Sequence, residues 1–154
     1  MTSELRVRFS TELKESLKSK DTVSMSTIRL IIAALKDRDI AARGQGKDDG
    51  ISDAEILSLL QTMVKQRRES IKMYDDGGRA ELAARENDEI TVIERFLPQQ
   101  LSDAEIEAAL KAAIAETGAE SMKDMGKVMA VVKANHPGTM DMGKASGMVK
   151  GLLQ

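Results

Sequence analysis

The 154-residue sequence has no cysteine and no tryptophan, and it contains only one tyrosine, two phenylalanines and two prolines. The absence of cysteine excludes disulfides, thiolate catalysis and cysteine-ligated metal sites. Any histidine-rich metal site would have to be built around the single histidine, His136, so we expect no metal and no cofactor. Few aromatic and clustered β-branched residues argue against an all-β fold. Aliphatic residues, alanine and ten methionines must fill the core.

The net charge of the chain is small, and its apolar runs are short. A formal net charge of −2 excludes a strongly basic, indiscriminate nucleic-acid binder, although it leaves room for a local basic patch. No apolar run approaches the roughly 20 residues that a membrane-spanning helix needs. The first residues alternate charged and apolar side chains and lack a signal-peptide core. We therefore expect a cytoplasmic protein without a membrane partner. The sequence leaves its oligomeric state open.

Helical periodicity covers nearly the whole chain. Near the N-terminus an apolar residue recurs at every fourth position, at Leu5, Phe9, Leu13 and Leu17. A second helix shows one apolar face, formed by Ile28, Ile31, Ile32 and Leu35. Ser24 or Ser26 is the N-cap predicted for this helix.

Two similar hexapeptides, residues 51–56 and 101–106, predict two further helix starts. Each has an apolar residue, then serine, then glutamate three positions later, which is the pattern of a capping box. The helix from Ser52 runs to the break at residues 75–78. A fourth helix follows and is stopped by Pro98. We therefore predict an all-α protein with an N-terminal bundle of about four helices (1–97) and a smaller three-helix C-terminal subdomain (98–154).

A repeat marks the C-terminal part. The sequence Asp-Met-Gly-Lys occurs at 124–127 and again at 141–144, and six of ten positions recur at this offset of 17 residues. Each copy is interpreted as a helix start with aspartate at the N-cap and lysine at N3. Lysine is unfavourable there for an isolated helix, because the positive end of the helix dipole lies nearby. The two copies are either simple caps or places where free N–H groups and a lysine hold an anion.

Small residues also occupy equivalent positions in the two copies of the repeat. Each helix carries three at four-residue spacing: Gly126, Ala130 and Ala134 in the first, and Gly143, Gly147 and Gly151 in the second. Close helix packing is the favoured interpretation of these stripes. The alternative is a smooth surface that accepts the backbone of a partner.

The third helix contains cations of two kinds. Lys65, Arg68 and Lys72 have the spacing of one basic stripe, which is either a solvated face or a phosphate site. Arg67 instead lies on the apolar stripe, and Glu86 has the same position in the next helix. If these helices pack antiparallel, Arg67 and Glu86 can form a structural pair inside their interface. We predict no catalytic residue.

A pattern known from other proteins is carried by residues 65–71, Tyr74, 78–79, 82–83, Glu86, Glu89, 96–101 and 122–129. Through these residues the sequence resembles the YqeY family over essentially the whole chain. It is also similar to the C-terminal tail of GatB, a subunit of the glutamine-dependent aspartyl/glutamyl-tRNA amidotransferase.

The resemblance implies two helical subdomains and a non-catalytic accessory role in tRNA binding or beside a tRNA amidotransferase. Carbon–nitrogen ligase activity with glutamine as amido-nitrogen donor is implied only by association with GatB, whose tail has no catalytic residue to transfer. An adaptor for an aminoacyl-tRNA-handling enzyme is the alternative. The expected partner is tRNA, bound weakly, because residues 118–154 carry a net charge of only +2. The candidate contacts are Lys123, Lys127, Lys133, Lys144 and Lys150, together with Lys65, Arg68 and Lys72.

Overall fold

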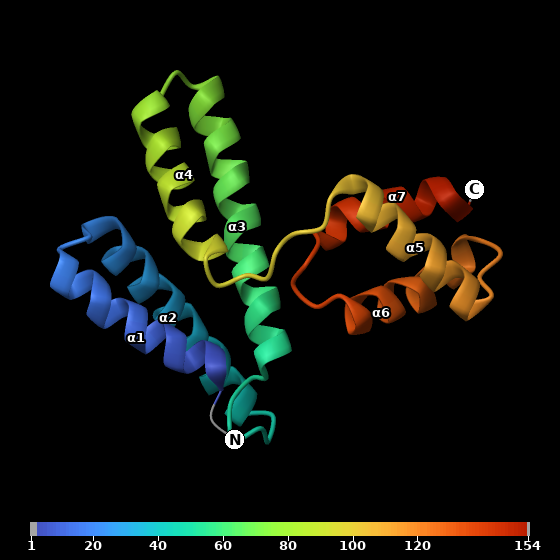
Figure 1. Ribbon diagram of the computed structural model, residues 1–154, viewed down its shortest axis with the longest axis horizontal. Coiled ribbons are helices and arrows are strands. Elements are labelled where there is room, and N and C mark those ends of the chain that lie inside the picture. Colours follow the sequence, from blue (N-terminus) through green and yellow to red (C-terminus); the bar gives the residue numbers. More distant parts are fainter. Residues whose placement is uncertain (1–2, 154) are drawn as a thin grey trace. The chain divides into compact units, whose positions relative to one another are not determined.

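The structure is a computed structural model that describes residues 3–153. Within these residues all regular structure is helical, with seven α-helices and one short 3-10 turn (Figure 1). The prediction of an all-α protein is confirmed. The chain divides into two compact units, residues 1–97 and residues 98–154.

The N-terminal unit consists of two helical hairpins, α1 with α2 and α3 with α4 (Figure 1). The helices are α1 (Glu4–Ser19), α2 (Thr22–Arg43), α3 (Asp53–Asp76) and α4 (Ala80–Glu94). All four contribute to one core, in which the rings of Phe9 and Phe96 meet edge to face with centroids 4.8 Å apart.

The predicted apolar stripe of α1, with its four residues at four-residue spacing, is only partly buried. Leu5 and Phe9 belong to the core, whereas Leu17 is 47% exposed. A step of four residues overshoots one helical turn by about 40°. Over three such steps the stripe therefore rotates away from the core, which explains why Leu17 faces outward.

The predicted cap of α2 was wrong. Asp21 is the N-cap, and its Oδ1 accepts a hydrogen bond of 3.1 Å from the backbone N–H of Ser24. The Ser24 hydroxyl donates to Oδ2 at 2.6 Å, and these two bonds lower the pKa of Asp21. Ser24 is thus a buried residue of the first helical turn and does not precede the helix.

The fourth helix also ends earlier than predicted, at Glu94 and not just before Pro98. The backbone N–H groups of Arg95, Phe96 and Leu97 donate to carbonyls three residues earlier. This tighter turn places Phe96 in the core at 2% exposure. The helix therefore ends four residues before Pro98, where the chain turns and the Phe96 ring is buried.

The capping boxes formed as predicted. Ser52 accepts from the N–H of Glu55, and Ser102 accepts from the N–H of Glu105. In return each glutamate accepts from the backbone N–H of its serine, and this bond lowers the pKa of both glutamates. These two motifs begin α3 and the first helix of the C-terminal unit.

A carboxylate joins three segments of the N-terminal unit. Asp39 accepts two hydrogen bonds from the Arg6 guanidinium, at 2.7 and 2.8 Å, and a third from the Ile51 N–H at 2.9 Å. Gly50 adopts a φ of +84°, and a side chain there would collide with Asp39. Asp39 therefore connects α1, α2 and the turn that leads into α3.

The C-terminal unit contains α5 (Asp103–Thr117), the 3-10 turn η1 (Met122–Asp124), α6 (Met125–Asn135) and α7 (Met142–Leu153). Its core is aliphatic. It includes Leu110 of α5, Val132 of α6, Val149 of α7 and the loop residue Met140. The entering chain is tied to the α6–α7 loop, because the Leu101 N–H donates to the Thr139 carbonyl at 2.8 Å.

The Asp39 network predicts an acid dependence of stability. The hydrogen bonds from Arg6 lower the pKa of Asp39 in the folded protein, so its contribution is present above the unfolded pKa of about 4. It is lost as pH falls through the folded pKa. Asp39→Asn should lower the free energy of unfolding by about 1–3 kcal/mol at pH 7, and this gap should close on acidification.

Urea unfolding between pH 3 and pH 7 measures both effects. Asp37→Asn, an exposed change on the same helix, is the control and should leave the profile unaltered. A gap between Asp39→Asn and the parent that stays constant across this range would contradict the role of the ionised carboxylate.

Candidate functional site

The two copies of the C-terminal repeat occupy equivalent positions in the core. Val128 and Val132 of α6 are buried, and their counterparts 17 residues later, Ala145 and Val149 of α7, are buried to the same degree. Because these pairs fix the rotation of both helices, the same repeat positions face outward in α6 and in α7.

The helix starts of the two copies differ. Asp141 caps α7, since its Oδ1 accepts from the N–H groups of Gly143 at 2.8 Å and Lys144 at 3.4 Å. Asp124 makes no such bond to α6 and accepts from the Glu120 N–H at 3.0 Å. That bond is the largest cause of the lowered pKa of Asp124. The prediction of two equivalent aspartate caps was therefore wrong for the first copy.

The stripes of small residues face outward. All six small residues are exposed, and a Cβ built at Gly126, Gly147 or Gly151 would meet nothing within 4 Å. The favoured interpretation, close packing between helices, was wrong. The packing contacts are made on the opposite side of each helix, by Val128 and Val132 of α6 and by Ala145 and Val149 of α7. The small residues form a smooth outer floor.

Lysines stand on both edges of this floor. At about 100° per residue, the small residues of α6 span an arc of about 80°, with Lys133 and Lys127 about 20° beyond either end. Lys150 and Lys144 have the same positions on α7, and all four are exposed. We call these two outward surfaces the α6 and α7 lysine faces. Neither helix contains an aspartate or glutamate.

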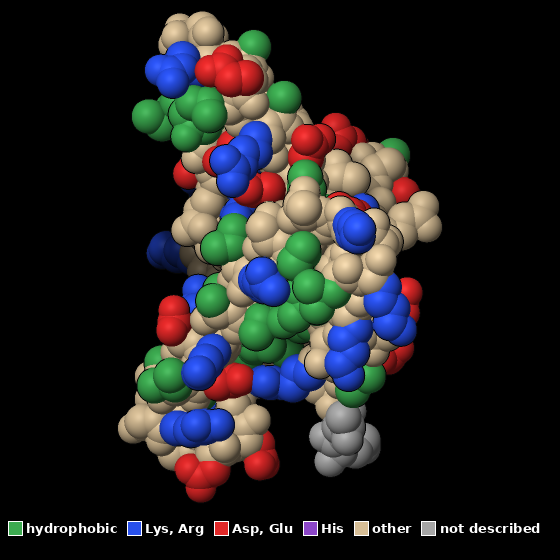
Figure 2. Space-filling view, turned by 90° about the vertical axis from the view of Figure 1, so that its left-hand side faces the viewer, with side chains coloured by type: hydrophobic (Ala, Val, Ile, Leu, Met, Phe, Trp, Pro, Cys, Tyr) green, Lys and Arg blue, Asp and Glu red, His purple; other side chains and the backbone are tan. Residues whose placement is uncertain are grey.

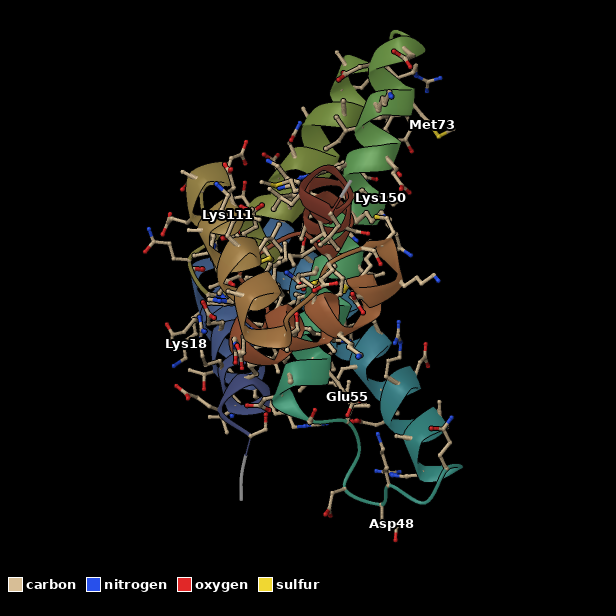
Figure 3. The ribbon with its side chains drawn as sticks, turned by 90° about the vertical axis from the view of Figure 1, so that its right-hand side faces the viewer. Lys18, Asp48, Glu55, Met73, Lys111 and Lys150 are labelled. Carbon is tan, nitrogen blue, oxygen red and sulfur yellow. The ribbon has the colours of Figure 1, made fainter. Side chains whose placement is uncertain are left out.

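The predicted lysines differ in their internal partners. Lys144 forms an ion pair with Asp103 at the start of α5. Lys123, Lys127, Lys133 and Lys150 have no ion pair within residues 3–153. Lys150 on α7 and Lys111 on α5 are labelled in Figure 3, and Lys111 pairs with Glu107 at 3.0 Å. Within the described part of the C-terminal unit, the lysines without an ion pair are therefore on η1, α6 and α7, whereas the lysine of α5 is paired within its own helix.

The basic stripe of α3 forms a patch of its own in the N-terminal unit. Lys65, Arg68 and Lys72 are all exposed. Arg68 pairs with Glu94 of α4 at 3.2 Å, and both side chains are well exposed. An exposed pair of this kind contributes little to stability, so the stripe keeps most of its positive charge available to a ligand.

Arg67 lies at the interface of α3 and α4, and Glu89 is its nearer partner. The Arg67 Nε donates to Glu89 at 2.9 Å, whereas Glu86 is 3.9 Å away. The side chains of Arg67 and Glu89 are 14% and 12% exposed. Glu89 was missed as a partner, although it is one turn beyond Glu86 on the same helix face.

A groove of about 400 Å³ opens beside this cluster. Seven of its nine lining residues belong to the segments on which the family resemblance rests. The lining residues are Leu30, Gln66, Arg67, Ser70, Tyr74, Leu82, Arg85, Glu86 and Glu89. The Ser70 hydroxyl donates to the Gln66 carbonyl at 3.1 Å and is not paired with a base. The groove can therefore hold a polar group but lacks an activated nucleophile.

Residues 3–153 lack the features of two other kinds of site. No group of three or more histidine, aspartate or glutamate side chains is placed to hold a metal ion. None of the helices is both long enough and apolar enough to cross a bilayer.

Comparison with known families identifies the chain. Residues 6–153 match the family described as Yqey-like protein. The chain belongs to the YqeY family. Curated relatives named "Altered inheritance of mitochondria protein 41, mitochondrial" are similar to it. The protein from Lachancea thermotolerans is 32% identical over 107 residues, and that from Vanderwaltozyma polyspora is 27% identical over 121 residues.

These matches cover 68% and 74% of the chain but only 55% and 63% of the two relatives. The Saccharomyces cerevisiae protein of the same name is 25% identical over 96 residues, half of its length. The chain thus spans between half and two thirds of the relatives it matches.

The names of these relatives contradict the prediction of a cytoplasmic location, because each is called mitochondrial. The prediction depended on composition and on the absence of long apolar runs. Those features bear on membrane-spanning helices and carry no information about the compartment in which a protein resides.

The outward orientation of the glycines gives a stability prediction. Gly147→Ala should raise the free energy of unfolding by about 0.5–1 kcal/mol, because alanine is the better helix former and its methyl group meets nothing. Chemical denaturation monitored by circular dichroism measures this. Val149→Ala, in the core of the same helix, should destabilise. A destabilised Gly147→Ala would show that the floor is a packing surface.

The Arg67 cluster gives a second prediction. Arg67→Met should cost about 2–3 kcal/mol of unfolding free energy, because the largely buried Glu89 and Glu86 lose their shared cation. Glu89 then keeps only the exposed Arg85, at 3.9 Å. Arg68→Met is the matched control and should cost at most about 1 kcal/mol, since its ion pair is exposed. Adding Glu89→Gln to Arg67→Met should restore part of the loss. Unchanged stability of Arg67→Met would refute the role of the pair.

Proposed function

We propose that this chain is a non-catalytic accessory protein that binds tRNA, with its C-terminal unit against the phosphate backbone. The observation that carries the proposal is the pair of lysine faces on α6 and α7. Each places cations on both edges of a floor that has no side chain longer than a methyl group. Lysine ammonium groups can reach phosphates, and the floor lets the sugar–phosphate chain come close to the helix.

The composition of the faces indicates what they can recognise. They contain no aromatic side chain on which a base could stack. Backbone contacts position a nucleic acid but carry no sequence information. The faces therefore fit the shape and charge of a folded RNA and do not fit a specific single-stranded sequence.

The available charge sets the strength of this interaction. The ion pair between Lys144 and Asp103 competes with a phosphate, but both groups are at least half exposed, so exchange costs little. With four or five lysines, we expect weak binding that falls steeply with salt.

A protein adaptor for a tRNA-handling enzyme is the second candidate. The smooth exposed floors favour it, because a partner helix can approach such a surface as closely as a phosphate chain can. Salt separates the two candidates. Binding through phosphates releases counterions and weakens steeply with ionic strength, whereas a floor-to-helix contact does so much less.

Fluorescence anisotropy with labelled tRNA at several salt concentrations tests the proposal. Lys127→Glu/Lys133→Glu/Lys150→Glu should weaken binding at low salt by about tenfold or more and reduce the salt slope by about 2–3. The control Lys14→Glu/Lys18→Glu/Lys111→Glu reverses three exposed lysines elsewhere and gives the same net charge. It should bind like the parent chain.

Three results would overturn the proposal. These are undetectable tRNA binding at low ionic strength, equal losses in the two triple variants, and hydrolysis of glutamine by the purified chain. A further variant, Lys65→Glu/Lys72→Glu, measures the separate contribution of the α3 patch.

A further inference from the structure

The outer seam between α1 and α2 combines apolar and cationic side chains that tRNA binding by α6 and α7 does not use. Figure 2 shows hydrophobic side chains gathered on this side of the N-terminal unit, with Lys and Arg side chains around them. We define the seam by its apolar residues Leu13, Leu17, Met25 and Ile32.

The ion pair between Arg6 and Asp39 shows which sides of the two helices meet at the seam. Arg6 reaches across from α1 to α2 at 2.7 Å. Leu13 is seven residues after Arg6 and Leu17 is eleven, so both lie on the Arg6 side of α1. Ile32 is seven residues before Asp39 and lies on the corresponding side of α2. The apolar residues of both helices therefore follow one line along the hairpin.

This line is open to solvent. Leu17 is 47% exposed, and Leu13, Met25 and Ile32 are only partly buried. Leu13 and Ile32 pack against the N-terminal core and keep only part of their surface accessible, so Leu17 is the most exposed member. A contiguous exposed apolar strip with polar edges is typical of a surface that a partner covers.

A row of cations runs along the same side of α2. Arg29, Lys36 and Arg43 are seven residues apart, which spaces them by about 10 Å along one helix face. All three are exposed, and the side chains of Arg29 and Lys36 have no ion pair or hydrogen bond within residues 3–153. Asp39, which lies among them, is already occupied by Arg6. Asp39 also interacts electrostatically with Arg43, so Arg29 and Lys36 are the least compensated cations of this positive edge.

The α1 edge of the seam is also positively charged, and so is the α1–α2 hairpin as a whole. On α1, Ser10, Lys14 and Lys18 follow one another at four-residue spacing, in a line beside Leu17. Both lysines are exposed. Residues 4–43 contain nine lysines and arginines against six aspartates and glutamates. A partner with an apolar side and negative charges would match both the apolar residues of the seam and its positively charged edges.

We propose that the seam binds an acidic amphipathic helix of a partner protein. The helix lies along the groove between α1 and α2 and places its apolar side chains against Leu17 and Ile32. Carboxylates spaced by seven residues meet Arg29, Lys36 and Arg43. Spanning these three cations takes about four helical turns, or about 15 residues. An RNA backbone would leave the apolar line uncovered, so the seam fits a helix better.

The test uses two synthetic 18-residue helical peptides with the same leucine face, one with glutamate and the other with lysine at every seventh position. Each is titrated into the full chain labelled with ¹⁵N. The glutamate peptide should shift amide signals of α1 and α2 in a saturable manner. The lysine peptide should not. Arg29→Glu/Lys36→Glu/Arg43→Glu should weaken binding of the glutamate peptide by about tenfold or more.

Leu17→Ser is a second variant. Its side chain is half exposed, so the fold should persist, and binding should weaken if the apolar line is used. The proposal is overturned if the glutamate peptide shifts signals outside α1 and α2 only, or if neither variant changes its affinity. It is also overturned if vesicles of phosphatidylglycerol bind the parent but not the triple variant while the glutamate peptide binds neither.

Discussion

The burial of matched small aliphatic residues in α6 and α7 is the constraint on which the candidate RNA-binding surface depends. Val128 and Val132 turn one side of α6 into the core, and Ala145 and Val149 do the same for α7. Once these side chains are buried, the lysines of the repeat can point only outward. Among the residues that recur identically, Val132 and Val149 are buried, and their burial fixes where the recurring lysines stand.

Two groups of cations in the chain have different roles. Arg6 and Arg67 are held by Asp39 and Glu89 at 2.7 and 2.9 Å, and each links helices of the N-terminal unit. Lys127 and Lys150 stand on helices that contain no carboxylate at all. The first group contributes to the fold, and the second keeps its charge available for an anionic partner.

Much of the fold could be predicted because its signals are local. The capping boxes at Ser52 and Ser102 are complete within four residues, and the all-α class follows from the helical periodicity. Orientation toward the core is not local. The spacing of Gly126 and its companions showed that they share a face. The opposite face, with Val128 and Val132, is uncharged as well, so spacing did not distinguish core from solvent. The Asp124 cap failed because its carboxylate accepts from the Glu120 N–H.

Chemical footprinting of lysines tests the central claim, that the lysine faces meet the phosphate backbone, most directly. The chain is briefly acetylated with and without tRNA at low salt, and the extent of modification at each lysine is read by mass spectrometry. The account predicts that tRNA protects Lys127, Lys133 and Lys150, while Lys111 on α5 reacts equally in both samples. Equal reactivity of Lys127, Lys133 and Lys150 with and without bound tRNA would contradict it.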